Sequence, residues 1–120
     1  KWLDILDLGC GSGHMGRQLE PLANYMTGID LSEEAIKHAM RTRTYDSIKQ
    51  GDVLTVTKGM LPSSVDLVVA ADLVPYFGDM SDLLSAIAAV TRPGGIITFN
   101  ADLFDGEDGS RPYELRFTGR

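Results

Sequence analysis

Glycine recurs in a short stretch near the N-terminus that reads DLGCGSGHMG, from Asp7 to Gly16. Glycine has no Cβ, so it tolerates positive φ angles and lets backbone N–H groups come close to a ligand. The residues that follow predict a helix, whose first N–H groups have no partner within the helix and would point at the same ligand. We therefore expect Gly9, Gly11 and Gly13 to line a ligand-binding site.

The glycines can be aligned with two known patterns. From Gly11 the stretch is Gly-x-Gly-x-x-Gly, the fingerprint of dinucleotide-binding domains. This alignment places Asp7 inside a parallel strand, where a carboxylate without a partner is costly to bury. From Asp7 the stretch is Asp-x-Gly-x-Gly-x-Gly. This alignment ends the strand near Asp7 and leaves the carboxylate at the rim of the sheet, where the strands end. We favour the second alignment, with Gly16 inside the following helix and allowing that helix to pack closely on the sheet.

Two further acids follow strand-like segments. Asp30 ends an apolar run 17 residues after Gly13 and could accept both hydroxyl hydrogens of a ribose. The alternative for Asp30 is a cap for the helix that follows. Asp52 follows a weaker strand and could accept a hydrogen bond from an adenine amino group, with Val53 packed on the ring. The alternative there is a turn built on Gly51 and Asp52.

The elements that must position these residues alternate along the chain. The strands expected from the apolar runs are Leu3–Leu8, Tyr25–Asp30, Ser47–Gln50, Val65–Asp72 and Ile96–Asn100. Val65–Asp72 is almost continuously apolar, which is typical of a parallel strand buried on both faces. Helices are expected at Gly13–Ala23, over Ser32–Met40, and after Asp79. This alternation predicts an α/β fold with a doubly wound, mainly parallel sheet.

Helix boundaries are indicated by capping residues and breakers. Ser32 is a good N-cap, and the helix after it has an apolar stripe made of Ala35, Ile36, Ala39 and Met40. Asp79 could cap a later helix that buries Leu83, Ile87 and Val90. Pro93 cannot continue that helix, and Gly94 or Gly95 can adopt a left-handed conformation after it.

Composition narrows the class of protein. The chain has 120 residues, 43% of them hydrophobic, which fits one small domain over residues 1–120. Cys10 is the only cysteine, so no intrachain disulfide can form, and with no secretory leader or apolar run of roughly 20 residues we expect a cytoplasmic protein without a membrane span. The net charge of −6 argues against a nucleic-acid partner, because Lys37, Arg41 and Arg43 form only a loose group on one helix.

Five segments, in this order and spacing, resemble a class I S-adenosylmethionine (SAM)-dependent methyltransferase. They are ILDLGCGSGHMGRQL, TGIDLSEEAIKHA, IKQGDVL, VDLVVAADLVPYFGD and LLSAIAAVTRPGGIITFN, and the likeness extends from Leu3 to about Asn100. The resemblance implies a Rossmann-like sheet with strand order 3-2-1-4-5. It also implies SAM as the cofactor and S-adenosylhomocysteine as its product. We expect the methyl acceptor to be a small molecule.

The resemblance also assigns roles to residues. The glycine loop would hold SAM, with Asp7 near its methionine end, Asp30 on the ribose, and Asp52 and Val53 at the adenine. The segment after the fourth strand would lie against the methionine and the transferred methyl. The complete set of expected cofactor-binding residues is Asp7, Gly9, Cys10, Gly11, Gly13, Met15, Asp30, Leu31, Asp52, Val53, Ala71, Asp72 and Leu73.

Methyl transfer from SAM needs no protein nucleophile, because the sulfonium already activates the methyl. Holding the acceptor in line with the methyl can contribute roughly 7–11 kcal/mol. A neutral acceptor could need a base, for which the weak candidates are His14, Asp72 and Tyr76. We assign no nucleophilic role to Cys10, and the sequence shows no metal-ligand spacing.

The chain departs from the family pattern at both ends. Such methyltransferases usually have helices before the first strand and finish with an antiparallel hairpin. Here a loop over residues 102–112 leads only to the start of a sixth strand at Tyr113–Thr118, so the C-terminal hairpin is incomplete. We expect a fragment of a longer protein, truncated at both ends, whose exposed fifth strand could pair with a second chain.

Two other functions are kept as alternatives. One is the dinucleotide-binding domain of an NAD- or FAD-dependent oxidoreductase. Gly51 and Asp52 after the third strand, and the alignment from Asp7, argue against it. The other is a non-catalytic module with the same fold that acts through partners.

Overall fold

Five parallel strands form one sheet in the order β3-β2-β1-β4-β5. The computed structural model describes residues 3–71 and 80–99 of the chain. The strands in chain order are β1 (Leu3–Leu8), β2 (Ala23–Asp30), β3 (Ser47–Gln50), β4 (Val65–Ala70) and β5 (Thr91–Phe99). This order confirms the sheet topology expected from the sequence.

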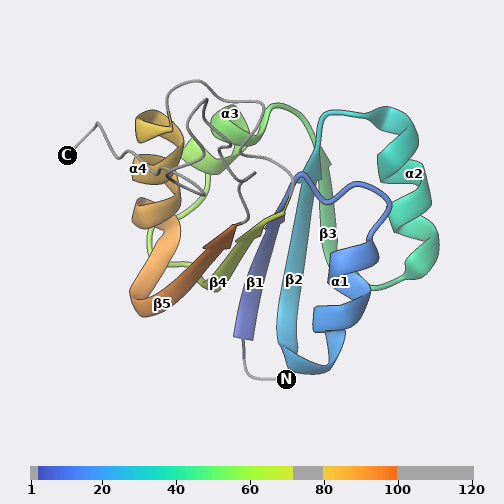
Figure 1. Cartoon of the computed structure of the whole chain (residues 1–120), viewed down its shortest axis with the longest axis horizontal. Helices are drawn as coiled ribbons and strands as arrows, with labels where there is room; N and C mark the ends of the chain where they lie inside the picture. The colour runs from blue at the N-terminus through green and yellow to red at the C-terminus, as the bar shows by residue number, and fades with distance from the viewer. Residues whose placement is uncertain (1–2, 72–79, 100–120) are drawn as a thin grey trace, which may run out of the picture.

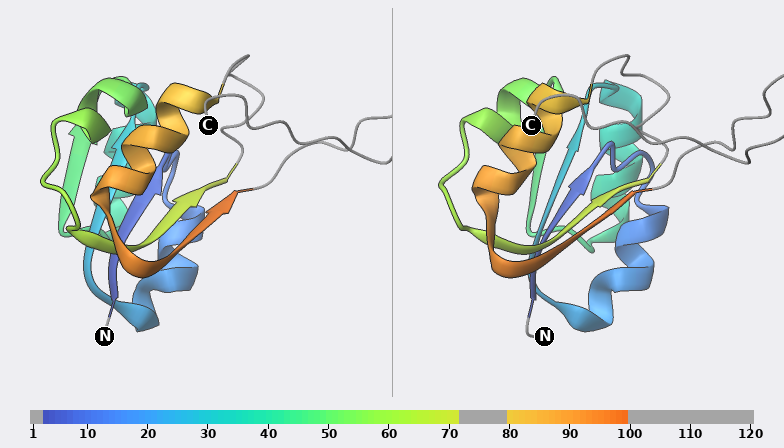
Figure 2. Two further views of the ribbon diagram at one scale, coloured as in Figure 1. Left: turned by 90° about the vertical axis from the view of Figure 1, so that its left-hand side faces the viewer. Right: turned by 60° about the vertical axis from the view of Figure 1, so that its left-hand side comes forward.

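Helices cover both faces of the sheet (Figures 1 and 2). One layer contains α1 (His14–Leu19), the short 3-10 helix η1 (Glu20–Leu22) and α2 (Glu33–Thr42), and the other contains α3 (Val53–Lys58) and α4 (Ser81–Val90). The crossovers through α1 and α2 therefore cover one face of the sheet, and those through α3 and α4 cover the other, as in a doubly wound fold. The loop after β1 lies at the carboxyl ends of the strands, where open α/β sheets bind their ligands.

The main core lies between the sheet and the layer of α3 and α4. Leu6 and Leu8 of β1 contribute to it together with Ile29, and α4 supplies Leu83 and Ile87. Side chains alternate between the two faces of a strand, so Asp7 points to the opposite layer, which contains α1 and α2. In β1, Leu6 and Leu8 thus face the main core, and Asp7 faces the layer of α1 and α2.

The first helix is shorter than the expected Gly13–Ala23. α1 ends at Leu19, η1 contains Pro21, and Ala23 already belongs to β2. Proline has no N–H to continue an α-helical ladder, and its ring clashes with the preceding turn. The sequence therefore contained the signal for this early end.

The second helix confirms its cap but not its full buried stripe. Ser32 Oγ accepts a hydrogen bond of 3.2 Å from the Ala35 N–H, and Ile36 and Ala39 are buried. Met40 is 58% exposed, so its expected burial is wrong. α2 covers the edge strand β3 with one narrow stripe, and Met40 lies beyond that stripe.

The fifth strand begins earlier than the expected Ile96. Thr91 pairs with Val65, and the register then jumps, so that Ile96 pairs with Leu67. The residues between them bulge out, and Gly94 takes the left-handed conformation expected of it, with φ 85°. The bulge brings Arg92 close to carboxylates of β1 and β4.

Arg92 joins the amino ends of these two strands. Its guanidinium donates to Asp66 Oδ2 at 2.8 Å and to Asp4 Oδ2 at 3.0 Å. Asp66 Oδ2 also accepts from the Asp4 N–H at 2.9 Å. These bonds hold β1 and β4 together at the end of the sheet opposite the glycine loop.

Some expectations lie outside the described residues or remain predictions. The proposed cap Asp79 lies outside them, and the N-cap position of α4 is held by Met80. Outside them too are Asn100, the loop over 102–112 and the sixth strand at Tyr113–Thr118. β5 is one of the two edge strands, and Ile96 on it is exposed, but self-association through this edge stays a prediction.

Candidate functional site

The glycine loop is tied to the end of β2. The N–H groups of Gly9 and Cys10 both donate to the Ile29 carbonyl, at 2.8 and 3.0 Å. Gly9, Gly11 and Gly13 have φ angles of 68°, 55° and 96°, as expected for a loop that only glycine adopts without strain. A Cβ at Gly11 would meet no atom within 4 Å, so the space above this part of the loop is open.

Asp30 is held at the carboxyl end of β2 by two backbone groups. Its Oδ2 accepts from the Gly11 N–H at 2.8 Å, and its Oδ1 accepts from the Ser32 N–H at 2.8 Å. A carboxylate has roughly four acceptor positions, so two such bonds leave capacity for ligand hydroxyls. The side chain thus has a fixed orientation beside the loop. Its bond to Ser32 also supports the start of α2, which was the alternative role considered for it.

Asp52 and Val53 follow β3, but their contacts are local. Asp52 caps α3, a helix that the sequence did not predict, and its Oδ2 accepts from the N–H and Oγ1 of Thr55 at 2.9 and 3.0 Å. Val53 is 7% exposed and packs in the main core. Contact of these two residues with an adenine ring stays a prediction.

Asp7 lies deeper than expected. β1 ends at Leu8, as expected, but Asp7 is 2% exposed between Gly28 of β2 and Val69 of β4, so its carboxylate is buried and its expected open position at the carboxyl end of the strand is wrong. The Tyr45 hydroxyl donates to Asp7 Oδ2 at 2.6 Å. This partner makes the buried position tolerable, and it removes one argument used against the dinucleotide alignment.

Burial sets the protonation of this pair. Desolvation raises the pKa of Asp7 to about 6, although the bond from Tyr45 acts in the opposite direction and the charge of Asp30 adds slightly to the rise. Burial and the bond to Asp7 likewise raise the pKa of Tyr45. Asp7 therefore changes charge near neutral pH, unlike an ordinary aspartate.

Tyr45 was missed in the sequence, although two glycines signalled its position. A Cβ at Gly28 would come within 2.9 Å of the Tyr45 ring, and one at Gly16 within 2.5 Å of it. Gly16 therefore makes room for the tyrosine that lies between α1 and the sheet, rather than for direct contact of α1 with the sheet. A glycine inside a strand, such as Gly28, is the kind of signal that marks a close approach.

We expect Gly16→Ala to lower the free energy of unfolding by about 1–3 kcal/mol, because the new methyl would overlap the Tyr45 ring. Gly59→Ala is the control, since a Cβ there would have only ordinary contacts, the nearest at 3.5 Å. Chemical denaturation of both variants measures the difference. Equal stabilities for the two variants would show that the ring does not fill the space at Gly16.

The other expected site residues differ in position. Leu31 is 70% exposed beside Asp30, Met15 is half-buried in the first turn of α1, and Ala71 is half-buried just after β4. His14 is exposed and contacts Gln18 at 3.1 Å. Cys10 is buried, and burial raises the pKa of its thiol to about 12, which argues against a nucleophile. Outside the described residues are Asp72, Leu73 and Tyr76.

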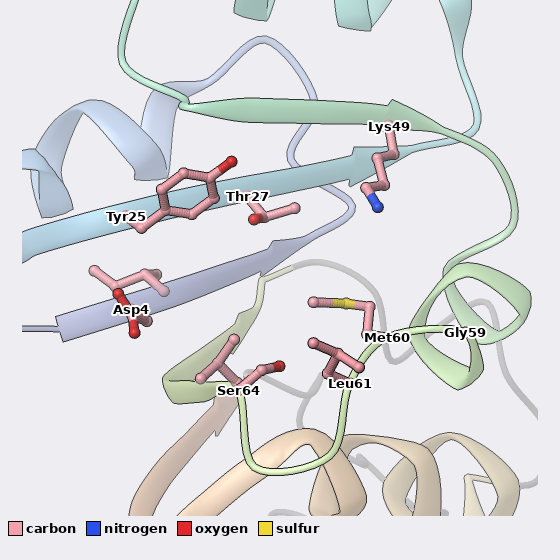
Figure 3. Close-up of a pocket in the computed structure, with 10 residues that line it drawn as sticks. Asp4, Tyr25, Thr27, Lys49, Gly59, Met60, Leu61 and Ser64 are labelled. Atoms are coloured by element: carbon pink, nitrogen blue, oxygen red, sulfur yellow. The ribbon is translucent and has the colours of Figure 1, made fainter.

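A separate hollow of about 480 Å³ lies on the sheet face that α3 and α4 cover (Figure 3). It is lined by Asp4 and Tyr25 near the starts of β1 and β2, and by Met60 and Leu61 after α3. Lys49 extends toward it from β3 (Figure 3). No residue of the glycine loop lines this hollow, so we do not assign the cofactor to it.

Residues 3–71 and 80–99 contain neither a candidate metal site nor a candidate membrane span. Within these residues no three His, Cys, Asp or Glu side chains are grouped so as to bind a metal ion. The helices of the same residues are too short or too polar for any to span a bilayer.

Known proteins resemble this chain in both sequence and fold. A family model described as "Methyltransferase domain" matches residues 6–99. The malonyl-[acyl-carrier protein] O-methyltransferase of Pectobacterium atrosepticum is 33% identical over 104 residues, which are 87% of this chain and 40% of that protein. The ubiquinone biosynthesis O-methyltransferase of Thiobacillus denitrificans is 31% identical over 100 residues, covering 80% of this chain and 43% of that protein.

A solved structure agrees with these relatives. The S-adenosylmethionine dependent methyltransferase from Mesorhizobium loti superposes with a TM-score of 0.68 at 29% identity, over 82% of this chain and 46% of that one. The chain thus spans less than half the length of each of these three proteins. The family match covers the end of β1, the glycine loop, Asp30 and the other four strands, and with the sheet order it shows that the chain belongs to the class I SAM-dependent methyltransferase family.

Proposed function

We propose that this protein binds SAM across the carboxyl ends of β1 and β2 and transfers its methyl group to an oxygen of a small-molecule acceptor. The observation that carries the proposal is the orientation of Asp30, fixed by Gly11 and Ser32 beside an open glycine loop. The family match supports SAM as the ligand, and the Mesorhizobium loti protein is named for the same dependence.

The residues present fit such a ligand. The loop presents backbone at Gly11 with no Cβ in the way, and the Asp30 carboxylate has capacity for the two ribose hydroxyls. The exposed side chain of Leu31 offers apolar surface next to them. When bound, SAM supplies a methyl group already activated by its sulfonium. The chain's own residues bind and orient, and this positioning is what methyl transfer requires of them.

The acceptor is proposed from the relatives and from charge. Both curated relatives are named as O-methyltransferases, which supports oxygen as the accepting atom. The net charge of −6 is unsuited to tracking phosphates and favours a small acceptor over a nucleic acid. Of the three candidates for a base, the described residues include only His14, and its exposure leaves it accessible to an acceptor.

Calorimetric titration with S-adenosylhomocysteine, SAM and NADH tests the ligand class. We expect both sulfur nucleosides to bind at a single site and NADH to show no binding at the same concentrations. Binding of NADH without binding of either sulfur nucleoside would contradict the proposal and favour an oxidoreductase domain.

A further inference from the structure

The pair formed by Asp7 and Tyr45 is not used in the binding scheme above. It lies beneath the glycine loop, between the sheet and α1, and its two oxygens are 2.6 Å apart. The two residues are 38 positions apart in the chain. A buried, short contact between such distant residues ties the segment after α2 to β1.

Three glycines from three elements make room for the tyrosine. Gly13 of the loop, Gly16 of α1 and Gly28 of β2 would each place a Cβ against the Tyr45 side chain. The backbone of Gly16, in the first turn of α1 where N–H groups have no helical partner, lowers the pKa of the hydroxyl. Tyr45 therefore packs its side chain against the loop, α1 and β2, and its hydroxyl bonds Asp7 of β1.

Among the residues that the structure describes, no cation contributes to the pKa of Asp7. Tyr45 faces it from the segment after α2, Cys10 from the glycine loop, and Asp30 from the end of β2. The strand neighbours Gly28 and Val69 are uncharged. On α1, which packs over this face, His14 and Arg17 are exposed. The hydroxyl of Tyr45 is thus the group that favours the charged form of Asp7.

The charge of Asp7 reaches the loop. It contributes to the raised pKa of the Cys10 thiol, so the carboxylate acts electrostatically on groups in the glycine loop. A buried charge is poorly screened by solvent, and a cation bound at the loop would be attracted to it. SAM has a sulfonium cation, whereas S-adenosylhomocysteine has a neutral thioether in its place.

We propose that Tyr45 is a positioning residue that keeps Asp7 ionised beneath the glycine loop, and that through this pair the affinity for the cationic cofactor depends on pH. The proposal rests on the proposed function. Protonation of Asp7 below neutral pH removes the buried negative charge and weakens SAM binding. The affinity for the neutral product depends less on that charge. Lowering the pH therefore brings the affinity for SAM closer to the affinity for the product.

The test is titration of the whole chain with SAM and with S-adenosylhomocysteine from pH 5 to pH 8, for the native protein and for Tyr45→Phe. Tyr25→Phe is the matched control, because Tyr25 is half exposed on β2 and lines the separate hollow. For the native protein we expect SAM affinity to fall roughly tenfold from pH 8 to pH 5, with a midpoint near 6, and affinity for the product to fall less.

For Tyr45→Phe we expect the midpoint to move up by roughly one pH unit, because a donor to the carboxylate is lost. SAM affinity at pH 7 should then be roughly twofold lower than that of Tyr25→Phe. A uniform loss of affinity with an unchanged midpoint would overturn the proposal and leave Tyr45 a packing residue. In Asp7→Asn the effect of Tyr45→Phe on the pH profile should disappear.

A second measurement needs no cofactor. The carboxyl carbon resonance of Asp7, identified by its loss in Asp7→Asn, should titrate near pH 6 in the native protein and at higher pH in Tyr45→Phe. An ordinary midpoint near 4, or one unmoved by the variant, would overturn the proposal even where the variant binds no cofactor. Failure of the native protein to bind SAM or its product would contradict the proposed function, and the resonance would still test the pair.

Discussion

Asp7→Asn is expected to increase the free energy of unfolding by roughly 3 kcal/mol at pH 8 and to change it little at pH 4. The pKa of Asp7 rises from 3.8 to about 6 on folding. The folded protein therefore binds the proton more tightly than the unfolded chain. Protonation of Asp7 therefore stabilises the folded state. This contribution to the free energy of unfolding is fully present below pH 3.8 and is lost as the pH rises through 6. Asparagine keeps an acceptor for Tyr45 without the buried charge.

Urea denaturation at several pH values measures this effect. The gain from Asp7→Asn should grow between pH 4 and pH 6 and stay constant above pH 7. Asp82→Asn is the control, because Asp82 is exposed in the first turn of α4. A gain that is the same at every pH would show that desolvation of the charge is not its cause. Evolution keeps such a destabilising group where function needs it, and this supports a role for Asp7 at the loop.

Asp30→Ala is expected to weaken binding of S-adenosylhomocysteine by roughly tenfold to a hundredfold, or about 1.5–3 kcal/mol. The variant removes the acceptor proposed for the ribose hydroxyls. It also removes the acceptor of the Gly11 N–H, so the loop loses one of its ties to β2. Calorimetric titration measures the loss directly.

Glu34→Gln is the matched control for Asp30→Ala, since Glu34 is an exposed acid in the first turn of α2. Its affinity should equal that of the native protein. Thermal unfolding separates loss of binding from loss of folding, because both variants should unfold within a few degrees of the native protein. An unchanged affinity in Asp30→Ala would exclude Asp30 from the ligand site.

Much of the fold follows from local signals in the sequence. β1 and β3 have the bounds expected from their apolar runs, and the strand order follows from the alternation of strands and helices. Ser32 caps α2 because its hydroxyl reaches the Ala35 N–H, a rule that depends only on spacing. α3 was missed because it has only six residues, too few for an apolar period to be visible.

The site was predictable in its backbone and less so in its side chains. The positive φ angles of Gly9, Gly11 and Gly13 agree with the expectation of a glycine-rich turn between a strand and a helix. The contact of Tyr45 with Asp7 joins residues far apart in sequence, and no local pattern encodes it. Val53 begins α3 and packs in the core, a position that depends on a helix the sequence did not predict, and its contact with an adenine ring stays a prediction.

The central claim is that a nucleoside binds at the carboxyl ends of the strands with its ribose on Asp30. A crystal structure of the chain with S-adenosylhomocysteine tests it most directly. We expect both ribose hydroxyls within hydrogen-bonding distance of the Asp30 carboxylate, and the ligand backed by the glycine loop. A nucleoside bound in the hollow beside Lys49, or a ribose with no contact to Asp30, would contradict the account.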